Sequence, residues 1–181
     1  RVAPGGAQQL YNVRPDLTIL GKIVGGGLPL AAYGGPQTIM RQLAPTGPVY
    51  QAGTLSGNPV AVAAGIATLE QLGKPGFYET LESRSAALAA GLSTAARDAH
   101  IPLTINRVGS MMTPFFTSGP VINYDDVLHS NKDRYNAFFH RMLNRGIYLA
   151  PSAFEALFVS FAHSDDDIRY TIDQARISFE E

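Results

Sequence analysis

A single lysine, Lys22, stands in a setting that suits covalent chemistry. It follows the short apolar run 17–20, is followed by Ile23 and Val24, and lies just before three consecutive glycines at 25–27. An amine at the end of a buried strand, with apolar neighbours that remove it from water, is activated as a nucleophile. Neighbouring glycines let the backbone approach a bulky planar group without a side-chain clash. The alternative is a surface lysine in a glycine-rich loop.

The glycines around Lys22 do not form a known nucleotide-binding motif. Ile23 occupies the place of the Ser or Thr that follows the lysine of a phosphate-binding P-loop, and the upstream glycine of that motif is missing. The run at 25–27 does not fit the GxGxxG dinucleotide fingerprint. The sequence therefore excludes both motifs at this position.

A second segment, 53–59, is suited to anion binding. It contains the hydroxyls of Thr54 and Ser56 and ends in Asn58-Pro59, a preferred N-cap followed by a residue favoured at the first helical position. Free N–H groups at a helix N-terminus bind phosphate. An ordinary capped turn explains Asn58-Pro59 equally well, so both interpretations stay open.

Few other side chains suggest chemistry. Glu155 is isolated in the apolar loop 150–156, where it is either a site residue or a solvent-facing carboxylate. The aspartates at 165–167 fit the charged first turn of a helix better than a calcium loop. No metal site is predicted, because the histidines are scattered and form no ligand pair: His100, His129, His140 and His163.

Composition excludes several classes of protein. The 181 residues carry 14 basic and 15 acidic side chains, which rules out a nucleic-acid reader with a basic face. Hydrophobic residues make up 45% and charged residues 16%, too apolar for a disordered chain, and no apolar run reaches the ~20 residues of a membrane span. Cysteine is absent, which excludes disulfides, thiolate metal sites and a cysteine nucleophile. A cytoplasmic enzyme is compatible with these features.

Hydrophobic periodicity predicts two domains, 1–74 and 75–181, separated near the Gly-Lys-Pro-Gly sequence at 73–76. The first is predicted as α/β, with a loop over 1–16, buried strands at 17–20 and 28–33, and helices at 37–43 and 58–72. The second is predicted as α+β, with helices at 77–99 and 131–145 and a final helix capped by Ser164. Its predicted strands are 103–108, 111–116, 147–150 and 157–162, with Pro114 placing the second at an edge or bulge.

Three segments in order resemble the glutamate-1-semialdehyde 2,1-aminomutase family, within the class III aminotransferases of pyridoxal-phosphate fold type I. They are LGKIVGGGLPLAAYGG at 20–35, GPVYQAGTLSGNP at 47–59 and LAPSAFEALFVSFAH at 149–163. Relatives that use ornithine or 4-aminobutyrate typically have Thr-Phe-Gly-Gly-Asn-Pro where this chain has Thr-Leu-Ser-Gly-Asn-Pro at 54–59. The resemblance extends over nearly the whole chain.

The resemblance implies a role for each candidate. Lys22 would be the Schiff-base lysine and proton carrier, and Thr54 would bind the phosphate of the neighbouring subunit's cofactor in a homodimer. Tyr50 and Glu155 match positions near the substrate. The implied cofactor is pyridoxal 5'-phosphate, with a pyridoxamine form in the cycle. The implied reaction converts glutamate-1-semialdehyde to 5-aminolevulinate for tetrapyrrole synthesis in the cytoplasm, without metal, nucleic acid or membrane.

The resemblance also implies that the chain is about the C-terminal two-fifths of such an enzyme. Residues 1–74 would complete the cofactor-binding large domain, and 75–181 would form the small domain. The family's pyridine-nitrogen aspartate, Ser-Gly-Thr phosphate loop and substrate-carboxylate arginine precede the position of Arg1, so the isolated chain is expected to be inactive. Two alternatives remain: an ω-aminotransferase, which needs an added amino acceptor, and a non-catalytic fragment with an exposed packing face.

Overall fold

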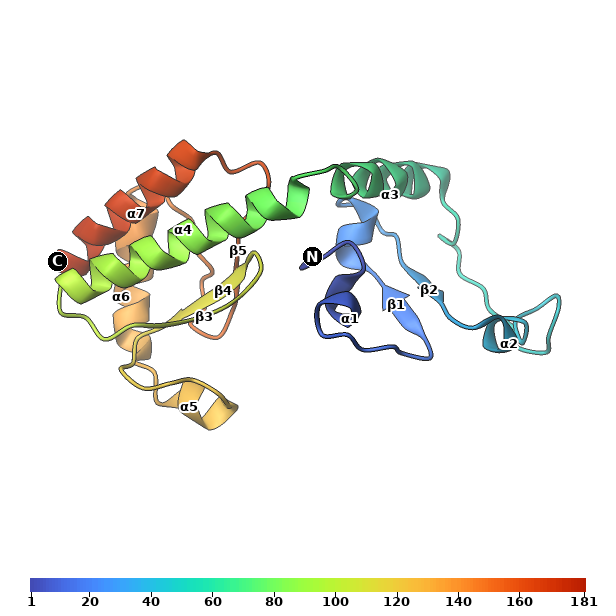
Figure 1. The fold of residues 1–181 in the computed structure, drawn as a ribbon, viewed down its shortest axis with the longest axis horizontal. Helices are drawn as coiled ribbons and strands as arrows, with labels where there is room; N and C mark the ends of the chain where they lie inside the picture. The colour runs from blue at the N-terminus through green and yellow to red at the C-terminus, as the bar shows by residue number, and fades with distance from the viewer. The chain divides into compact units, whose positions relative to one another are not determined.

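A computed structural model describes all 181 residues and divides into two compact units, Arg1–Tyr78 and Glu79–Glu181 (Figure 1). The fold is mixed α/β, as predicted, and the division falls within the first turn of helix α4 (Phe77–Asp98). None of the helices combines the length and the apolar character that a membrane crossing requires.

The first unit is built around a short antiparallel ribbon. Strands β1 (Thr18–Leu20) and β2 (Ala32–Gly34) pair with Ile19 opposite Tyr33. The remaining elements of the unit are α1 (Gly6–Leu10), the 3-10 helix η1 (Lys22–Gly25), α2 (Gln37–Met40) and α3 (Pro59–Leu72).

Helix α3 begins as the sequence predicts. The Asn58 side chain accepts hydrogen bonds from the N–H groups of Val60 and Ala61, both at 3.1 Å, and Pro59 occupies the first turn. These two bonds satisfy donors that have no partner inside the helix. The face of α3 with Ala61 and Gly65 is buried, so this helix supports the turn that follows β1.

Three predictions for the first unit are wrong. The strand at 17–20 is not buried, because no layer of this chain covers its outer face: Ile19 is 82% exposed. The strand at 28–33 is reduced to β2, since only residues opposite β1 find backbone partners. Residues 1–16 are not all loop, because α1 forms one short turn of helix there.

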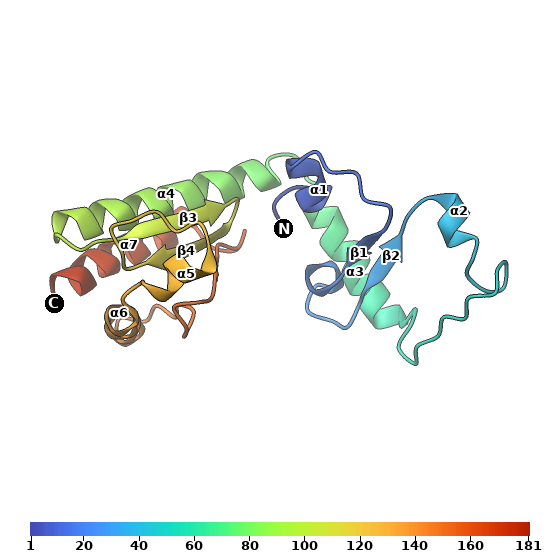
Figure 2. The same cartoon turned by 90° about the horizontal axis from the view of Figure 1, so that it is seen from below.

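The second unit combines four helices with a small antiparallel sheet. The sheet contains β3 (Thr104–Val108), β4 (Met111–Phe115) and β5 (Leu157–Phe158) in the order β3-β4-β5. Figure 2 shows α4 running alongside the β3–β4 hairpin. The other helices are α5 (Tyr124–Leu128), α6 (Lys132–Asn144) and α7 (Asp165–Glu180).

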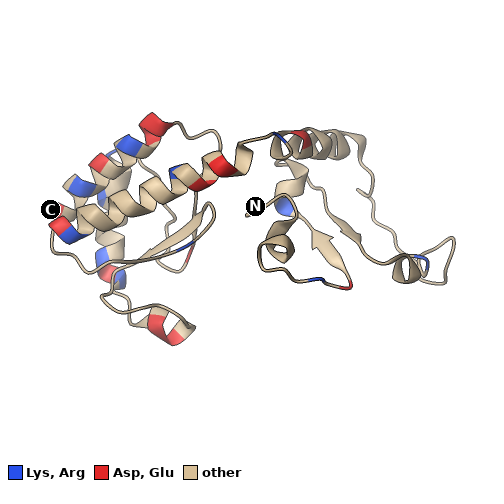
Figure 3. Cartoon of the chain, viewed as in Figure 1, with Lys and Arg blue, Asp and Glu red and all other residues tan.

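The core of the chain lies in the second unit, where α4, α6 and α7 contribute apolar faces at helical spacing. The rings of Phe138 and Phe179 stack with centroids 4.6 Å apart at its centre. The charged residues of α4 and α7 are interspersed along these helices in Figure 3, whereas β1 and β2 carry none. The main members of the core are Leu88, Leu92, Met112, Phe116, Tyr135, Phe138, Met142, Ile168, Ala175 and Phe179.

The strands of the second unit follow the prediction only in part. β3 and β4 pair as expected, and Ile105 lies opposite Pro114. β4 is the middle strand, but β5 pairs with it only at Met111 and Met112, so Pro114 still has a partner strand on one side alone. The predicted strand at 147–150 is wrong, because no strand lies beside it to complete a ladder.

Candidate active site

Lys22 occupies a sharp turn directly after β1. Gly21 is extended, and Lys22, the first residue of η1, has φ +56°. A side chain other than glycine in this left-handed region costs ~1 kcal/mol or more, and such positions concentrate at functional sites. The left-handed backbone of Lys22 therefore gives its side chain a direction that a residue with an ordinary negative φ would not have.

Two glycines allow α3 to pack closely against this turn. A Cβ added at Gly65 of α3 would overlap the Leu30 side chain and lie 3.0 Å from the Val24 carbonyl oxygen. Gly26 has φ +59°, and a Cβ there would overlap the Thr68 hydroxyl. The position of the Lys22 turn is therefore set by backbone-to-helix contact with α3.

The Lys22 side chain is exposed and lines a cavity of about 420 Å³ within the first unit. The expectation that apolar neighbours bury the amine is wrong for this chain, since Leu20 is itself 48% exposed. Ile19, Leu20, Ile23 and Val24 provide apolar wall, and no carboxylate lines the cavity. A primary amine beside apolar wall fits covalent attachment of pyridoxal phosphate, while a partner for its ring nitrogen is not among these residues.

Thr54 lies in the turn that precedes α3, and its hydroxyl is exposed. Asn58 already uses the N–H groups of Val60 and Ala61, so the helix itself offers fewer free donors than the sequence suggested. The turn closes through a hydrogen bond from the Ser56 N–H to the Gly53 carbonyl at 2.9 Å. The N–H of Thr54 has no bond within the chain, which leaves this residue with two donors for an anion.

Thr54 and Lys22 do not line one cavity. The residues around Thr54 border a separate cavity of about 350 Å³, and Ile19 alone lines both. Tyr50 is 83% exposed and lies in the loop before that turn. The structure thus keeps Lys22 and Thr54 in one unit but at separate sites.

Glu155 belongs to the second unit, in the loop between α6 and β5. The Glu155 N–H donates to the Ser152 carbonyl at 3.1 Å, and the Thr113 hydroxyl approaches the Glu155 carbonyl at 3.4 Å. Its carboxylate takes part in none of the chain's ion pairs. A carboxylate on a restrained backbone with no partner of its own is available to a ligand.

Tyr135 of α6 is a residue near Glu155 that sequence reasoning missed. Burial, and secondarily the charge of Glu155, raise the pKa of Tyr135 to about 12. Its hydroxyl donates to the Ala150 carbonyl at 2.6 Å. The only sequence signal is its spacing with Phe138, Phe139 and Met142, which identifies a core face and not this contact.

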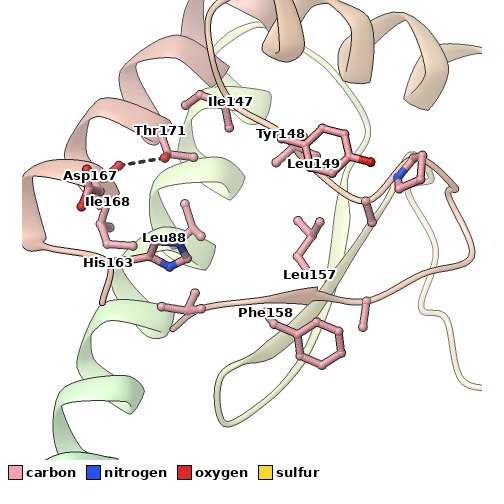
Figure 4. A pocket seen from close by; sticks show the side chains of 14 residues that line it. Leu88, Ile147, Tyr148, Leu149, Leu157, Phe158, His163, Asp167, Ile168 and Thr171 are labelled. Carbon is pink, nitrogen blue, oxygen red and sulfur yellow. Dashed lines mark hydrogen bonds between the residues drawn. The ribbon is translucent and has the colours of Figure 1, made fainter. Parts of the chain in front are cut away.

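Figure 4 shows an apolar pocket of the second unit, about 320 Å³, between residues 147–151 and β5. Three of its polar side chains, those of His163, Asp167 and Thr171, form hydrogen bonds with neighbouring residues. The Thr171 hydroxyl donates to the Asp167 carbonyl at 2.7 Å, and His163 Nδ1 accepts from the Ser160 N–H at 3.0 Å. No three His, Asp or Glu side chains gather as a metal site anywhere in the chain. This pocket has no converging groups for catalysis.

Comparison with known proteins identifies the family. The Aminotransferase class-III family matches residues 5–175, and the chain belongs to this family, whose members depend on pyridoxal phosphate. It is 57% identical over 173 residues to glutamate-1-semialdehyde 2,1-aminomutase 2 of Brevibacillus brevis, covering 96% of this chain and 40% of that protein. It is 56% identical over 176 residues to the aminomutase of Desulfitobacterium hafniense, covering 97% and 41%. The resemblance inferred from sequence is confirmed, and the chain spans about 40% of these relatives' length.

Solved structures match the same portion. An ω-transaminase from Sphaerobacter thermophilus superposes with a TM-score of 0.86 at 25% identity, over 99% of this chain and 41% of that one. A β-phenylalanine aminotransferase from Variovorax paradoxus gives 0.86 at 31% identity, over 96% and 40%. A glutamate-1-semialdehyde aminomutase from Pseudomonas aeruginosa, in complex with PMP, gives 0.83 at 23% identity over 98% and 41%, and supports the fold alone.

Proposed function

We propose that this chain is part of a pyridoxal-phosphate-dependent glutamate-1-semialdehyde 2,1-aminomutase, an isomerase that forms 5-aminolevulinate for tetrapyrrole synthesis. The observation that carries the proposal is Lys22, an exposed amine on a left-handed turn beside an apolar cavity. The 56–57% identity to curated aminomutases supports the choice of substrate. A cytoplasmic location belongs to the same proposal.

Each candidate residue has a role in this proposal. When bound, the cofactor would stabilise negative charge at the substrate carbon. Lys22 Nζ would bond the cofactor covalently and later carry the proton between two carbons, since an amine released from that bond is a base. The turn held by α3 would orient Nζ. Tyr50 and Glu155 would lie near the substrate.

Thr54 would serve a second copy of the protein. Thr54 is not among the residues that line the Lys22 cavity, and its neighbours Gly53, Leu55 and Ser56 border a separate cavity. A phosphate held there would belong to the cofactor of the partner subunit, so the active protein would be a homodimer. In this arrangement residues 1–74 would be part of the large domain and residues 75–181 the small domain.

Borohydride reduction of the complete enzyme tests the central assignment. Reduction makes the covalent attachment of pyridoxal phosphate permanent, and peptide mapping then locates the label. We expect the label on Lys22, because the other two lysines, Lys74 and Lys132, lie outside its cavity. A label on either of these would overturn the proposal. The isolated 181-residue chain should hold the cofactor loosely and be inactive, because no carboxylate lines the Lys22 cavity.

A second candidate, an ω-aminotransferase, draws support from the superposition on the Sphaerobacter ω-transaminase. The two activities differ in stoichiometry. An aminomutase turns over glutamate-1-semialdehyde without an added keto acid, whereas an aminotransferase stops after one half-reaction. Turnover that requires an amino acceptor would therefore favour the second candidate.

A further inference from the structure

The loop that carries Glu155, residues 150–156, is anchored at its start by a buried tyrosine; we name it the Glu155 loop. The Tyr135 side chain is 1% exposed, and its ring packs edge-on against Phe116 at 6.2 Å. From this fixed position the Tyr135 hydroxyl donates a 2.6 Å hydrogen bond to the Ala150 carbonyl. Because the ring is buried and packed, this bond restrains the first residue of the loop.

The rest of the Glu155 loop is restrained as well. The N–H of Glu155 bonds to the carbonyl of Ser152, and the hydroxyl of Thr113 approaches the carbonyl of Glu155. The amine of Lys132 lies 4.9 Å from the centre of the Phe154 ring. The backbone is thus held by α6 and β4, while the Glu155 carboxylate stays exposed.

We propose that Tyr135 is the positioning residue of Glu155: it fixes the Glu155 loop in one conformation so that the carboxylate meets the substrate without first being ordered. This inference rests on the proposed function, which places Glu155 near the substrate. A group already held in place spares the loss of conformational freedom on binding. The loop sets the position of the Glu155 carboxylate, and Tyr135 acts only by holding the loop.

The hydroxyl of Tyr135 suits this role at every physiological pH. Burial, with a smaller contribution from the charge of Glu155, raises the pKa of Tyr135. The phenol therefore stays protonated and remains a donor to Ala150.

The test uses three single variants of the complete enzyme. Tyr135→Phe removes only the hydroxyl, and Glu155→Gln removes only the charge. Tyr170→Phe is the control, since the Tyr170 hydroxyl also donates to a backbone carbonyl, that of Arg145 at 3.1 Å, which lies outside the Glu155 loop. Amide hydrogen exchange over 150–156 measures how well the loop is ordered. The kcat/KM for glutamate-1-semialdehyde measures how far that order matters for the reaction.

We expect Tyr135→Phe to speed exchange in the Glu155 loop by about tenfold and to lower kcat/KM by a similar factor, with no change in Tyr170→Phe. The double variant Tyr135→Phe/Glu155→Gln should be no worse than Glu155→Gln alone, because residues that act through one another are not additive. Unchanged exchange, or multiplied losses in the double variant, would overturn the proposal.

One further outcome separates this inference from the proposed function. If Glu155→Gln retains full activity while exchange responds as expected, Glu155 does not serve the substrate, and the positioning role is refuted. The borohydride label on Lys22 is independent of this result. The aminomutase proposal can therefore survive the failure of the inference about Tyr135.

Discussion

Replacing Gly65 by alanine tests the contact that sets the Lys22 turn. An alanine Cβ would overlap the end of the Leu30 side chain, which can rotate away, and would lie 3.0 Å from the Val24 carbonyl oxygen, which belongs to the turn. The matched control is Gly73→Ala at the other end of α3. Its Cβ would lie 3.4 Å from the Leu69 carbonyl oxygen, and its φ of −81° is compatible with alanine.

Both substitutions reduce the entropy of the unfolded chain, but only Gly65 lies inside α3, where alanine also improves helix propensity; Gly73 follows the last helical residue. At Gly65 the two effects together are worth about 1 kcal/mol. They are opposed there by overpacking, which costs about 1–3 kcal/mol in a close contact. We expect Gly65→Ala to destabilise the turn by about 1 kcal/mol and Gly73→Ala to stabilise its end of the helix by about 0.5 kcal/mol.

Local hydrogen exchange is the suitable assay, because a large enzyme need not unfold in two states. A loss of about 1 kcal/mol in Gly65→Ala is roughly a fivefold change in the opening equilibrium of residues 22–27. Capture of added pyridoxal phosphate by the apoenzyme, followed at the visible band, should be slower in Gly65→Ala and unchanged in Gly73→Ala. If both variants behave alike, α3 does not set the turn of Lys22.

Three further changes test other parts of the chain. Asn58→Ala should cost α3 about 1 kcal/mol by thermal unfolding, whereas Asn58→Ser should retain most of the cap. Thr54→Ala should weaken cofactor retention on gel filtration more than it lowers Tm; equal losses would mean that it has only a structural role. The hydrogen bond from Arg107 lowers the pKa of Glu82 below 4.5, so this pair stabilises the fold above that pH and loses its contribution as pH falls through the lowered value. Glu82→Gln should therefore lose less stability than the unmodified protein between about pH 5 and pH 3, by under ~1 kcal/mol after solvent screening.

Local signals predicted the four longest helices, α3, α4, α6 and α7, because their determinants are adjacent in sequence, whereas the short helices α1 and α5 were missed. Asn58-Pro59 begins α3, Ser164 caps α7 through Asp167, and Gly146 with φ +80° follows α6. Each of these positions acts on a backbone group within four residues. Strands did not follow from sequence in the same way, because a strand exists only where a second segment pairs with it. Residues 147–150 have the strand pattern and lack the partner.

The features of the candidate site also fall into two groups, those with local determinants and those that depend on segments distant in sequence. Lys22 stands out in sequence because its glycines and its place after an apolar run are local features. Its left-handed φ and its dependence on Gly65 are not local, since α3 begins 37 residues after Lys22 and must fold back onto the turn. The same holds for Tyr135 and Ala150, which are 15 residues apart and meet through one hydrogen bond.

The solvent exposure of apolar segments was the property that the sequence predicted least well, for a physical reason. An apolar run indicates that a segment is suited to burial, but it does not indicate which other segment covers it. β1 has the composition of a buried strand, yet Ile19 is 82% exposed, and the outer side of β2 leaves Tyr33 at 43%. A two-stranded ribbon is marginal by itself, so we expect a further segment of the proposed complete enzyme to cover β1. The exposure of Lys22 has the same origin: its apolar neighbours can shield an amine only when they are themselves shielded. If Lys22 has the proposed role, the environment of its amine would be set by the assembled enzyme, whereas its backbone conformation, held by Gly21, Gly26 and α3, belongs to this chain.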